Sequence, residues 1–376
     1  MQNRKEPRLV FGEGRISGAL SVLLGASSCI AVLCFHFPEY LTTPELRRVY
    51  PIEILRGTLL AGMLAAALLG GMSIWLSRSP RLGFLGMALA LLAEWMGGAH
   101  VELDSFEEPL VSFGFDWLVI ALLANSAIFI FIERAWPHRP EQLTFRPEWR
   151  LDLVYYAFNH VMVGIVLLVT TAFSEGLFGW AVHDGLQLAV RQQPLPMQLL
   201  EVLIVADLFQ YAGHRAMHEL PTLWKFHAVH HCPVAMDWLA GSRMHFLEVL
   251  FVRSTVLLPI FLLGFDEAAI NGYVIWVGIQ SVLIHANTGI TFGPLEGWLA
   301  SPRFHHWHHA ADAEAIDRNY AAHLPAIDRV FGTFLDSGSR WPSRYGVVGK
   351  PLPDGFIAQH LYPFMKGQGS REDLRK

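Results

Sequence analysis

Long apolar segments recur along the chain and are separated by short polar stretches. A helix that crosses a bilayer needs about 20 mostly apolar residues, and several segments meet or approach that length. The clearest are residues 16–35, 57–76, 82–98, 117–133 and 153–173. A sixth segment, residues 197–213, is short and contains Asp207. The pattern predicts an all-α, polytopic bundle of membrane helices.

Two further apolar segments, residues 246–264 and 268–286, are harder to interpret. The first contains Glu248 and Arg253, and charged side chains are expensive inside a membrane. These two segments are therefore either full spans or half-buried, re-entrant helices. The segment at 16–35 does not resemble a cleavable signal peptide, because its apolar stretch is too long and no small-residue cleavage site follows it.

Composition supports a membrane protein and excludes other classes. Of 376 residues, 53% are hydrophobic and 16% are charged, against about 25% charged in a soluble domain. The net charge of −5 argues against nucleic acid as a partner. The three cysteines, Cys29, Cys34 and Cys232, have no CxxC spacing, so they suggest neither a disulfide framework nor a cysteine-based zinc or iron–sulfur site.

The distribution of charge predicts an orientation, because Lys and Arg favour the cytoplasmic side of a membrane. The N-terminus and the link at 134–150 are rich in arginine, whereas the turn at 102–108 is acidic. We therefore expect the N-terminus, the link and the following histidine-rich region to face the cytoplasm, with the acidic turn outside. Arg47, Arg48 and Arg56 do not fit this scheme.

The link at 134–150 also predicts a division of the chain. Plain apolar helices precede it and all the clustered histidines follow it. We expect an N-terminal transmembrane module at 1–140, a catalytic domain at 141–340 and a C-terminal tail at 341–376. The Gly-, Pro- and Ser-rich composition after residue 336 predicts an extended tail.

Histidine is the unusual residue of this chain: eleven of its 18 histidines lie between His214 and His309. Eight of them form an HxxxH motif and two HxxHH motifs, whose spacings place the rings on one helical face. These eight are His214, His218, His227, His230, His231, His305, His308 and His309. They exceed the four ligands of an ordinary zinc site, so the sequence predicts a site for two metal ions, facing the cytoplasm.

Other residues are candidates for the same site. His245 and His285 lie near the motifs and are predicted metal ligands, and Asp207, Tyr211, His214 and His218 form one stripe of a helix. Asp207 and Tyr211 are the candidate catalytic residues. We expect Asp207 to accept a hydrogen bond from the far nitrogen of a metal-binding histidine. His306 and His323 are either additional ligands or polar contacts near the site.

The motifs together resemble those of a known family. The stretches "DLFQYAGHRAMHELPTLWKFHAVHH", "RMHFLE", "HANTG", "SPRFHHWHHA" and "NYAAHLPAIDRVFGTF" resemble the fatty acid hydroxylase/sterol desaturase superfamily over roughly residues 200–338. The resemblance implies an integral membrane, non-haem di-iron enzyme whose ligands are the eight motif histidines, with His285 a further family histidine. His245 departs from the family pattern, because Phe246 follows it where many members have proline.

The chemistry of iron fits this expectation, because imidazole suits iron and zinc has no redox change. We expect two iron ions to use O2 to hydroxylate a C–H bond of a membrane lipid, such as a fatty acyl, sterol or sphingolipid-like substrate. The chain has no electron-carrying motif of its own, so an external donor is implied: a reductase, a ferredoxin or a cytochrome. Alternatives are a lipid or sterol desaturase and an ether-lipid-cleaving monooxygenase. A non-enzymatic metal store or transporter is disfavoured, because its polar groups should lie near the bilayer midplane.

Overall fold

A computed structural model describes residues 13–47, 51–76, 80–102 and 111–365. Within these ranges the chain is helical, with no strand and two isolated bridge pairs. It forms two compact units, residues 1–121 and 122–376. The predicted all-α class is thereby confirmed, whereas the functional boundary predicted at residue 140 stays a prediction.

Eight described helical segments are long and apolar enough to cross a membrane. They are Arg15–His36, Ile52–Leu76, Arg81–His100, Phe115–Ala135, Val163–Ala181, Leu195–Glu219, Phe246–Leu263 and Glu267–His285. The two segments of uncertain type are therefore long enough for full spans. The acidic turn of residues 103–108, and the basic residues Arg4, Lys5, Arg8, Arg48 and Arg78, lie outside the described residues.

The predicted helix at 153–173 requires a correction. It is divided at Met162 into α7 (Trp149–Val161) and α8 (Val163–Phe178). The division reflects polarity: α7 carries Asp152 and Asn159, whose side chains bond to the region around Ser242 and Arg243. Only α8, with its short extension to Ala181, is apolar enough to span a membrane.

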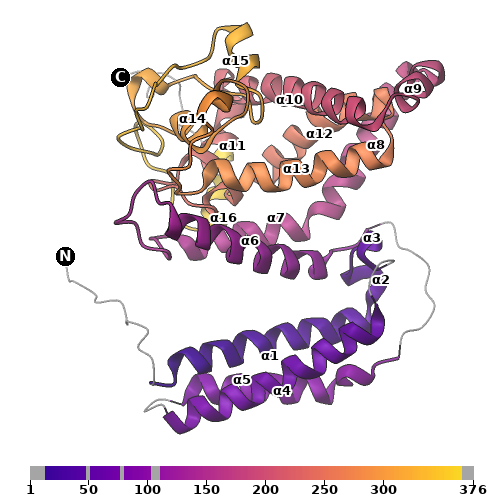
Figure 1. Cartoon of the computed structure of the whole chain (residues 1–376), viewed down its shortest axis with the longest axis vertical. Coiled ribbons are helices and arrows are strands. Elements are labelled where there is room, and N and C mark those ends of the chain that lie inside the picture. Colours follow the sequence, from indigo (N-terminus) through magenta and orange to yellow (C-terminus); the bar gives the residue numbers. More distant parts are fainter. Residues whose placement is uncertain (1–12, 48–50, 77–79, 103–110, 366–376) are drawn as a thin grey trace. The chain divides into compact units, whose positions relative to one another are not determined.

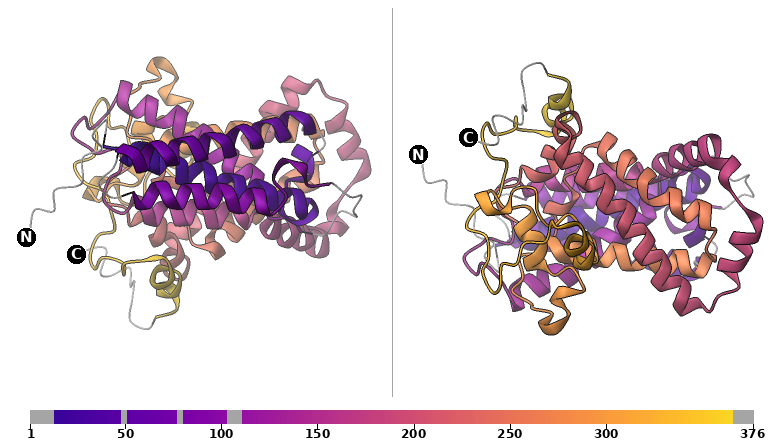
Figure 2. Two further views of the ribbon diagram at one scale, coloured as in Figure 1. Left: turned by 90° about the horizontal axis from the view of Figure 1, so that it is seen from below. Right: turned by 90° about the horizontal axis from the view of Figure 1, so that it is seen from above.

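The first unit is a bundle of α1 (Arg15–His36), α4 (Ile52–Leu76) and α5 (Arg81–Trp95), which lie side by side (Figure 2, left). Small residues let these backbones approach closely, as is common in membrane helices. Ser21 Oγ donates to the carbonyl of Ala66 at 2.7 Å. A Cβ atom at Gly86 would lie 2.6 Å from the carbonyl carbon of Ser21. Two short helices, α2 (Pro38–Leu41) and α3 (Pro44–Arg47), follow α1.

In the second unit, α10 (Leu195–Glu219) packs against both α12 (Phe246–Leu263) and α13 (Glu267–His285), and α8 packs against α12 (Figure 1). The apolar core between them includes Val202, Ala206, Val256, Ile260 and Ala269. The division between residues 121 and 122 falls within α6 (Phe115–Ala135). The chain runs up α10, down α12 and up α13. The C-terminal end of α10 therefore lies near the start of α12 and the end of α13.

At that end of the second unit lie the short helices α11 (Pro221–His231), α14 (Pro302–His308), α15 (Pro325–Phe331) and α16 (Phe356–Leu361), whereas α9 (Asp184–Arg191) lies at the opposite end (Figures 1 and 2). The expectation of an extended tail after residue 336 is wrong for α16 and the turn after it. Leu352 and Tyr362 are buried against Tyr155 and Val229, so apolar side chains hold this segment on α7 and α11.

Candidate metal centre

The three histidine motifs converge at one end of the second unit. His214 and His218 lie in the last turns of α10, and His285 ends α13. The other motif histidines belong to α11 and to α14 with its C-terminal residue. The 134–150 link is at the same end, because Arg146 pairs with Asp237. The predicted grouping of the link with the histidines is therefore observed.

Nine histidines form two clusters, and all nine are buried. Within each cluster, one ring nitrogen per residue lies within 4.8 Å of the others. Cluster A consists of His214, His218, His227, His231 and His308. Cluster B consists of His230, His285, His305 and His309. Each HxxHH motif therefore contributes to both clusters, because its i, i+3 and i+4 rings diverge enough to reach two neighbouring points.

Backbone carbonyls fix the orientation of several of these rings through Nδ1. The Nδ1 atoms of His214, His230, His285 and His308 lie 2.6–3.1 Å from the carbonyl oxygens of Tyr320, Arg243, Ser281 and Arg318. A carbonyl can only accept a hydrogen bond, so each of these Nδ1 atoms carries the proton. In the neutral ring the Nε2 atom then presents a bare lone pair.

The Nε2 atoms face one another at short distances. His227 Nε2 lies 2.9 Å from His214 Nε2 and 3.0 Å from His231 Nε2 in cluster A. In cluster B, His305 Nε2 lies 3.0 Å from His285 Nε2 and 3.1 Å from His309 Nε2. These contacts join nitrogens that carry lone pairs, which repel unless a proton or a cation lies between them.

Protonation of these rings to the charged imidazolium is unfavourable. Burial, reinforced by the neighbouring histidines, lowers the pKa of six histidines outside the spans well below the ordinary value: His227, His230, His231, His305, His308 and His309. Metal ions bind the neutral form. Neighbouring ligand nitrogens at about 2.1 Å from one ion and at right angles to each other lie about 3.0 Å apart, which matches the observed separations. The residues therefore fit a metal ion in each cluster.

Glu248 is a partner of the site that the sequence analysis did not assign. Its Oε1 atom accepts a hydrogen bond from His227 Nδ1 at 2.6 Å, and Oε2 accepts from the backbone N–H of His245 at 3.3 Å. A carboxylate behind a metal-binding imidazole orients the ring and increases its basicity. The available signal was an acid in an otherwise apolar helix, which is usually functional.

Asp207 lies close to the site but does not contact a histidine ring of either cluster. Its carboxylate accepts hydrogen bonds from the backbone N–H groups of Ala322, His323 and Leu324 at 2.6–3.3 Å. The predicted bond to a metal-binding imidazole is thus replaced by an indirect role. Asp207 holds the loop that carries the carbonyl of Tyr320, and that carbonyl accepts from His214.

Tyr211 is buried beside this loop. Its hydroxyl shares a hydrogen bond with Thr333 Oγ1 at 2.9 Å and accepts one from Arg215 at 3.2 Å. Its ring stacks on Phe331. These contacts support the loop rather than the cluster nitrogens.

His245 lies outside both clusters, and its environment explains why. Its Nδ1 atom accepts from the N–H of Leu247 at the start of α12, and its Nε2 atom lies 3.0 Å from the carbonyl oxygen of His360. Both ring nitrogens are therefore engaged, and we leave His245 out of the proposed ligand set. The ring connects α12 to α16.

His306 and His323 also lie outside the clusters. His306 Nδ1 bonds to the hydroxyl of Tyr345 at 2.8 Å, and its Nε2 atom donates towards the carbonyl of Ala286 at 3.1 Å. His306 therefore supports the end of α13. His323 is buried near Tyr273, with a separation of 6.3 Å between ring centroids.

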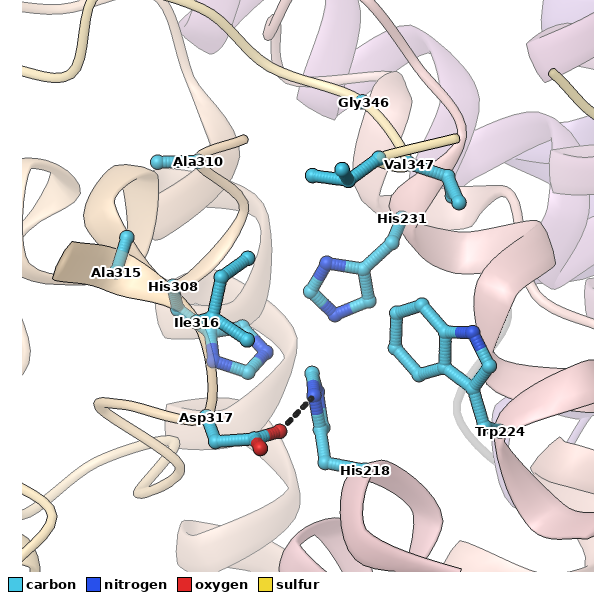
Figure 3. Close-up of a pocket in the computed structure, with 11 residues that line it drawn as sticks. His218, Trp224, His231, His308, Ala310, Ala315, Ile316, Asp317, Gly346 and Val347 are labelled. Carbon is cyan, nitrogen blue, oxygen red and sulfur yellow. Dashed lines mark ion pairs between the residues drawn. The ribbon is translucent and has the colours of Figure 1, made fainter. Parts of the chain in front are cut away.

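A pocket opens onto cluster A. The rings of His218, His231 and His308 line it together with Trp224 and Ile316 (Figure 3). Asp317 lies beside His218 at the pocket, with 4.0 Å between its carboxylate and Nδ1 (Figure 3). A small molecule can therefore approach three members of this cluster from outside the protein.

Comparison with known proteins identifies relatives of this arrangement. A family model described as fatty acid hydroxylase matches residues 199–333, which include all nine clustered histidines. An ornithine lipid hydroxylase from Rhizobium tropici is 29% identical over 300 residues, covering 76% of this chain and 85% of that relative. No solved structure gives a significant match.

Two further relatives are similar over a shorter region. An alkylglycerol monooxygenase from Danio rerio is 31% identical over 139 residues, covering 36% of this chain and 30% of that relative. A fatty acid hydroxylase from a Lecanicillium species is 31% identical over 152 residues, covering 35% of this chain and 40% of that relative. The chain therefore spans most of the first relative but less than half the length of these two.

Proposed function

We propose that this chain is a membrane di-iron monooxygenase of the fatty acid hydroxylase/sterol desaturase superfamily and that it hydroxylates a lipid, because it is similar to a fatty acid hydroxylase model and to lipid hydroxylases. The observation that carries this proposal is the pairing of buried Nε2 atoms, 2.9–3.1 Å apart, in two adjacent clusters. Two sets of neutral nitrogen donors suit two ions of a redox-active metal such as iron.

The proposed reaction consumes O2, two electrons and two protons. One oxygen atom enters a C–H bond to give an alcohol, and the other leaves as water. Two iron ions, when bound, would supply the reductive activation of O2 that breaking such a bond requires. The electrons come from a separate reductase, ferredoxin or cytochrome.

The protein's own residues prepare the site for this reaction. The carbonyls of Tyr320, Arg243 and Arg318 hold the Nδ1 protons of three ligands, so that the Nε2 atoms point at the metal positions. Glu248 does the same for His227 and adds the negative charge that neutral ligands lack. Trp224 and Ile316 give the pocket over cluster A an apolar lining.

We place the metal centre on the cytoplasmic side of the membrane. Lys and Arg are favoured in short cytoplasmic loops, and the exposed Arg134 and Arg150 flank the link at the histidine end. At the opposite end, the loop between α12 and α13 carries Asp266 and no basic residue. A reporter fused after Arg146 should indicate a cytoplasmic position, and a reporter fused after Asp266 should indicate a position on the other side of the membrane. The reverse result would contradict this orientation.

The first substrate to test is an ornithine lipid, because the similarity to the ornithine lipid hydroxylase covers most of both chains. Cleavage of an ether lipid is a second candidate, favoured by the similarity to alkylglycerol monooxygenases. Hydroxylation of the carbon beside an ether oxygen gives a hemiacetal, which breaks down to an aldehyde and an alcohol. The two candidates therefore differ in substrate and not in the oxidation step.

The decisive experiment supplies ¹⁸O2 to iron-loaded protein in lipid, with ferredoxin, ferredoxin reductase and NADPH as the electron source. We expect one labelled oxygen atom in the hydroxyl of the product. An unlabelled alkene would indicate a desaturase. Label from H2¹⁸O, or turnover without O2, would contradict the oxygenase and favour a hydrolytic metal site.

A further inference from the structure

Arg253 is a charged residue in the membrane-spanning helix α12, and it is exposed. Within the part of the chain that the structure describes, no hydrogen bond or ion pair engages its guanidinium. Asp207 on the adjacent α10 is already occupied by three backbone N–H groups. Ionisable residues inside membrane segments are rare and usually mark a substrate or ion path, so the absence of a protein partner for Arg253 requires an explanation.

Two buried polar side chains without partners lie near this charge. The hydroxyl of Tyr273 and both ring nitrogens of His323 have no hydrogen-bond partner among the described residues. The two side chains are 5% and 1% exposed, respectively, and their ring centroids are 6.3 Å apart. Unpaired buried polar groups cost stability, so a pair of them beside a free cation suggests a polar ligand.

Packing brings Arg253 towards these groups. Both α12 and α13 pack against α10, and Tyr273 shares an apolar core with Val256, which follows Arg253 by about one turn on α12. The N–H of His323 bonds to Asp207 on α10. Burial lowers the pKa of His323 to about 4, and the charge of Arg253 is the second cause. The three side chains thus belong to elements that gather around α10.

The group lies deeper in the membrane region than the metal centre. Arg253 follows Glu248 by five residues on α12, which is about 7.5 Å at the rise of an α-helix. Asp207, which binds the N–H of His323, precedes His214 by seven residues on α10, or about 10 Å. Both distances run from the histidine clusters into the spans.

We propose that Arg253, Tyr273 and His323 form a subsite for the anionic group, a carboxylate or a phosphate, of the substrate lipid. This proposal rests on the lipid oxygenation proposed above. Guanidinium binds both anions through paired N–H donors, and Tyr273 and His323 add neutral donors. The subsite then holds the anionic group deeper in the membrane than the metal centre, and the acyl chains lie in the bilayer. The polar head group therefore extends towards the histidine clusters. The oxidised C–H bond therefore belongs to the head group.

Binding to metal-free protein tests the subsite without depending on catalysis. The probes are an ornithine lipid, which carries a carboxylate, phosphatidylglycerol, which carries a phosphate, and diacylglycerol, which carries neither. Native mass spectrometry of detergent-purified protein gives the affinity for each. The variants are Arg253→Gln and Arg253→Lys, and the matched control is Arg134→Gln, which removes an exposed arginine from the last turn of α6.

We expect Arg253→Gln to weaken binding of an anionic lipid by about tenfold or more, as for the loss of a charge-assisted hydrogen bond. Binding of diacylglycerol should not change, and Arg253→Lys should fall between wild type and Gln because it keeps the charge without the paired donors. Which of the two anionic lipids responds identifies carboxylate or phosphate. Unchanged affinity for both would overturn the subsite and leave Arg253 as a residue that extends to the membrane surface.

Two further measurements keep the proposal testable. If Arg253→Gln does not fold, the test uses Arg253→Lys and Tyr273→Phe instead. Unchanged affinity for anionic lipids in both of these variants would also overturn the subsite. Fragmentation of the oxidised lipid in a mass spectrometer should place the new hydroxyl in the head group. A hydroxyl in an acyl chain would contradict the proposed orientation of the lipid.

One outcome separates the subsite from the proposed function. Anion-selective binding without oxygenation in the wild-type protein would support the subsite and contradict the proposed function.

Discussion

Clusters A and B lie side by side, but the protein holds them with different partners. Cluster A has five histidines, a carboxylate hydrogen-bonded to His227 and a second carboxylate 4.0 Å from His218. Cluster B has four histidines, and carbonyl oxygens support His230 and His285. Among the described residues no carboxylate bonds to a ring of cluster B. The pocket also borders cluster A.

This difference predicts that the two proposed metal positions are not equivalent. Negative charge behind a ligand favours a divalent cation, and more ligands hold it more firmly. We infer that cluster A binds its ion more tightly and receives O2 through the pocket. Cluster B is the position from which metal is lost first. Substitutions in one cluster at a time can test this inequality.

The largest effect should follow removal of a ligand. His308→Ala should empty cluster A and His305→Ala should empty cluster B, so that each variant retains about one of two metal ions. Both should lose oxygenase activity by more than about 100-fold, above the range for partners of ligands. Elemental analysis of purified protein gives the metal content. Full metal content in a His305/His308 double variant would contradict the assignment of both clusters.

A smaller and more selective effect is expected at Glu248. Glu248→Gln keeps an oxygen that accepts from His227 Nδ1 but removes the charge, so metal affinity should fall by about 10-fold or more at one position only. Titration with a chelator should then release the ion of cluster A more readily, while that of cluster B is unchanged. Glu248→Asp, which restores the charge, should recover part of the affinity. Equal weakening of both ions in Glu248→Gln would mean that the carboxylate does not distinguish the clusters.

The sequence predicted the clustered histidines better than the groups that support them, for a physical reason. Helical spacing determines which histidines share a face, so the motifs at 214–231 and 305–309 predict that these rings gather at one place. Their supports are backbone carbonyls from distant loops, such as those of Tyr320 and Arg318. Every residue has a carbonyl, so no pattern of side chains can identify these partners.

The helices also differ in how far the local sequence pattern predicts them. Apolar length alone located the spans, but not the break at Met162, where polar contacts of α7 with the site end the apolar helix. Glu248 was visible as a charge in an apolar segment, but its partner His227 lies 21 residues away. Tertiary contact, rather than local pattern, assigns such a residue its role.

An intermediate effect is expected at Asp207, which supports cluster A through the loop. Asp207→Asn loses a charged acceptor for the N–H groups of Ala322–Leu324, so the Tyr320 carbonyl should hold His214 less firmly. We expect a loss of activity of about 10-fold with most of the metal retained. Metal content and activity measured on the same sample separate the two effects. Complete loss of the cluster A ion would show that the loop is needed for binding itself.

The smallest effect should be at His245, where the sequence and the structure disagree most. His245→Ala removes the acceptor for the Leu247 N–H at the start of α12 and the contact to His360. Loss of a helix cap costs about 1 kcal/mol, so thermal stability should decrease slightly. Metal content should stay at about the wild-type level, because neither ring nitrogen faces a cluster. His245→Asn, which can cap the helix but provides no imidazole, should restore the stability. Loss of one metal ion in both variants would return His245 to the ligand set and make the two clusters equal in size.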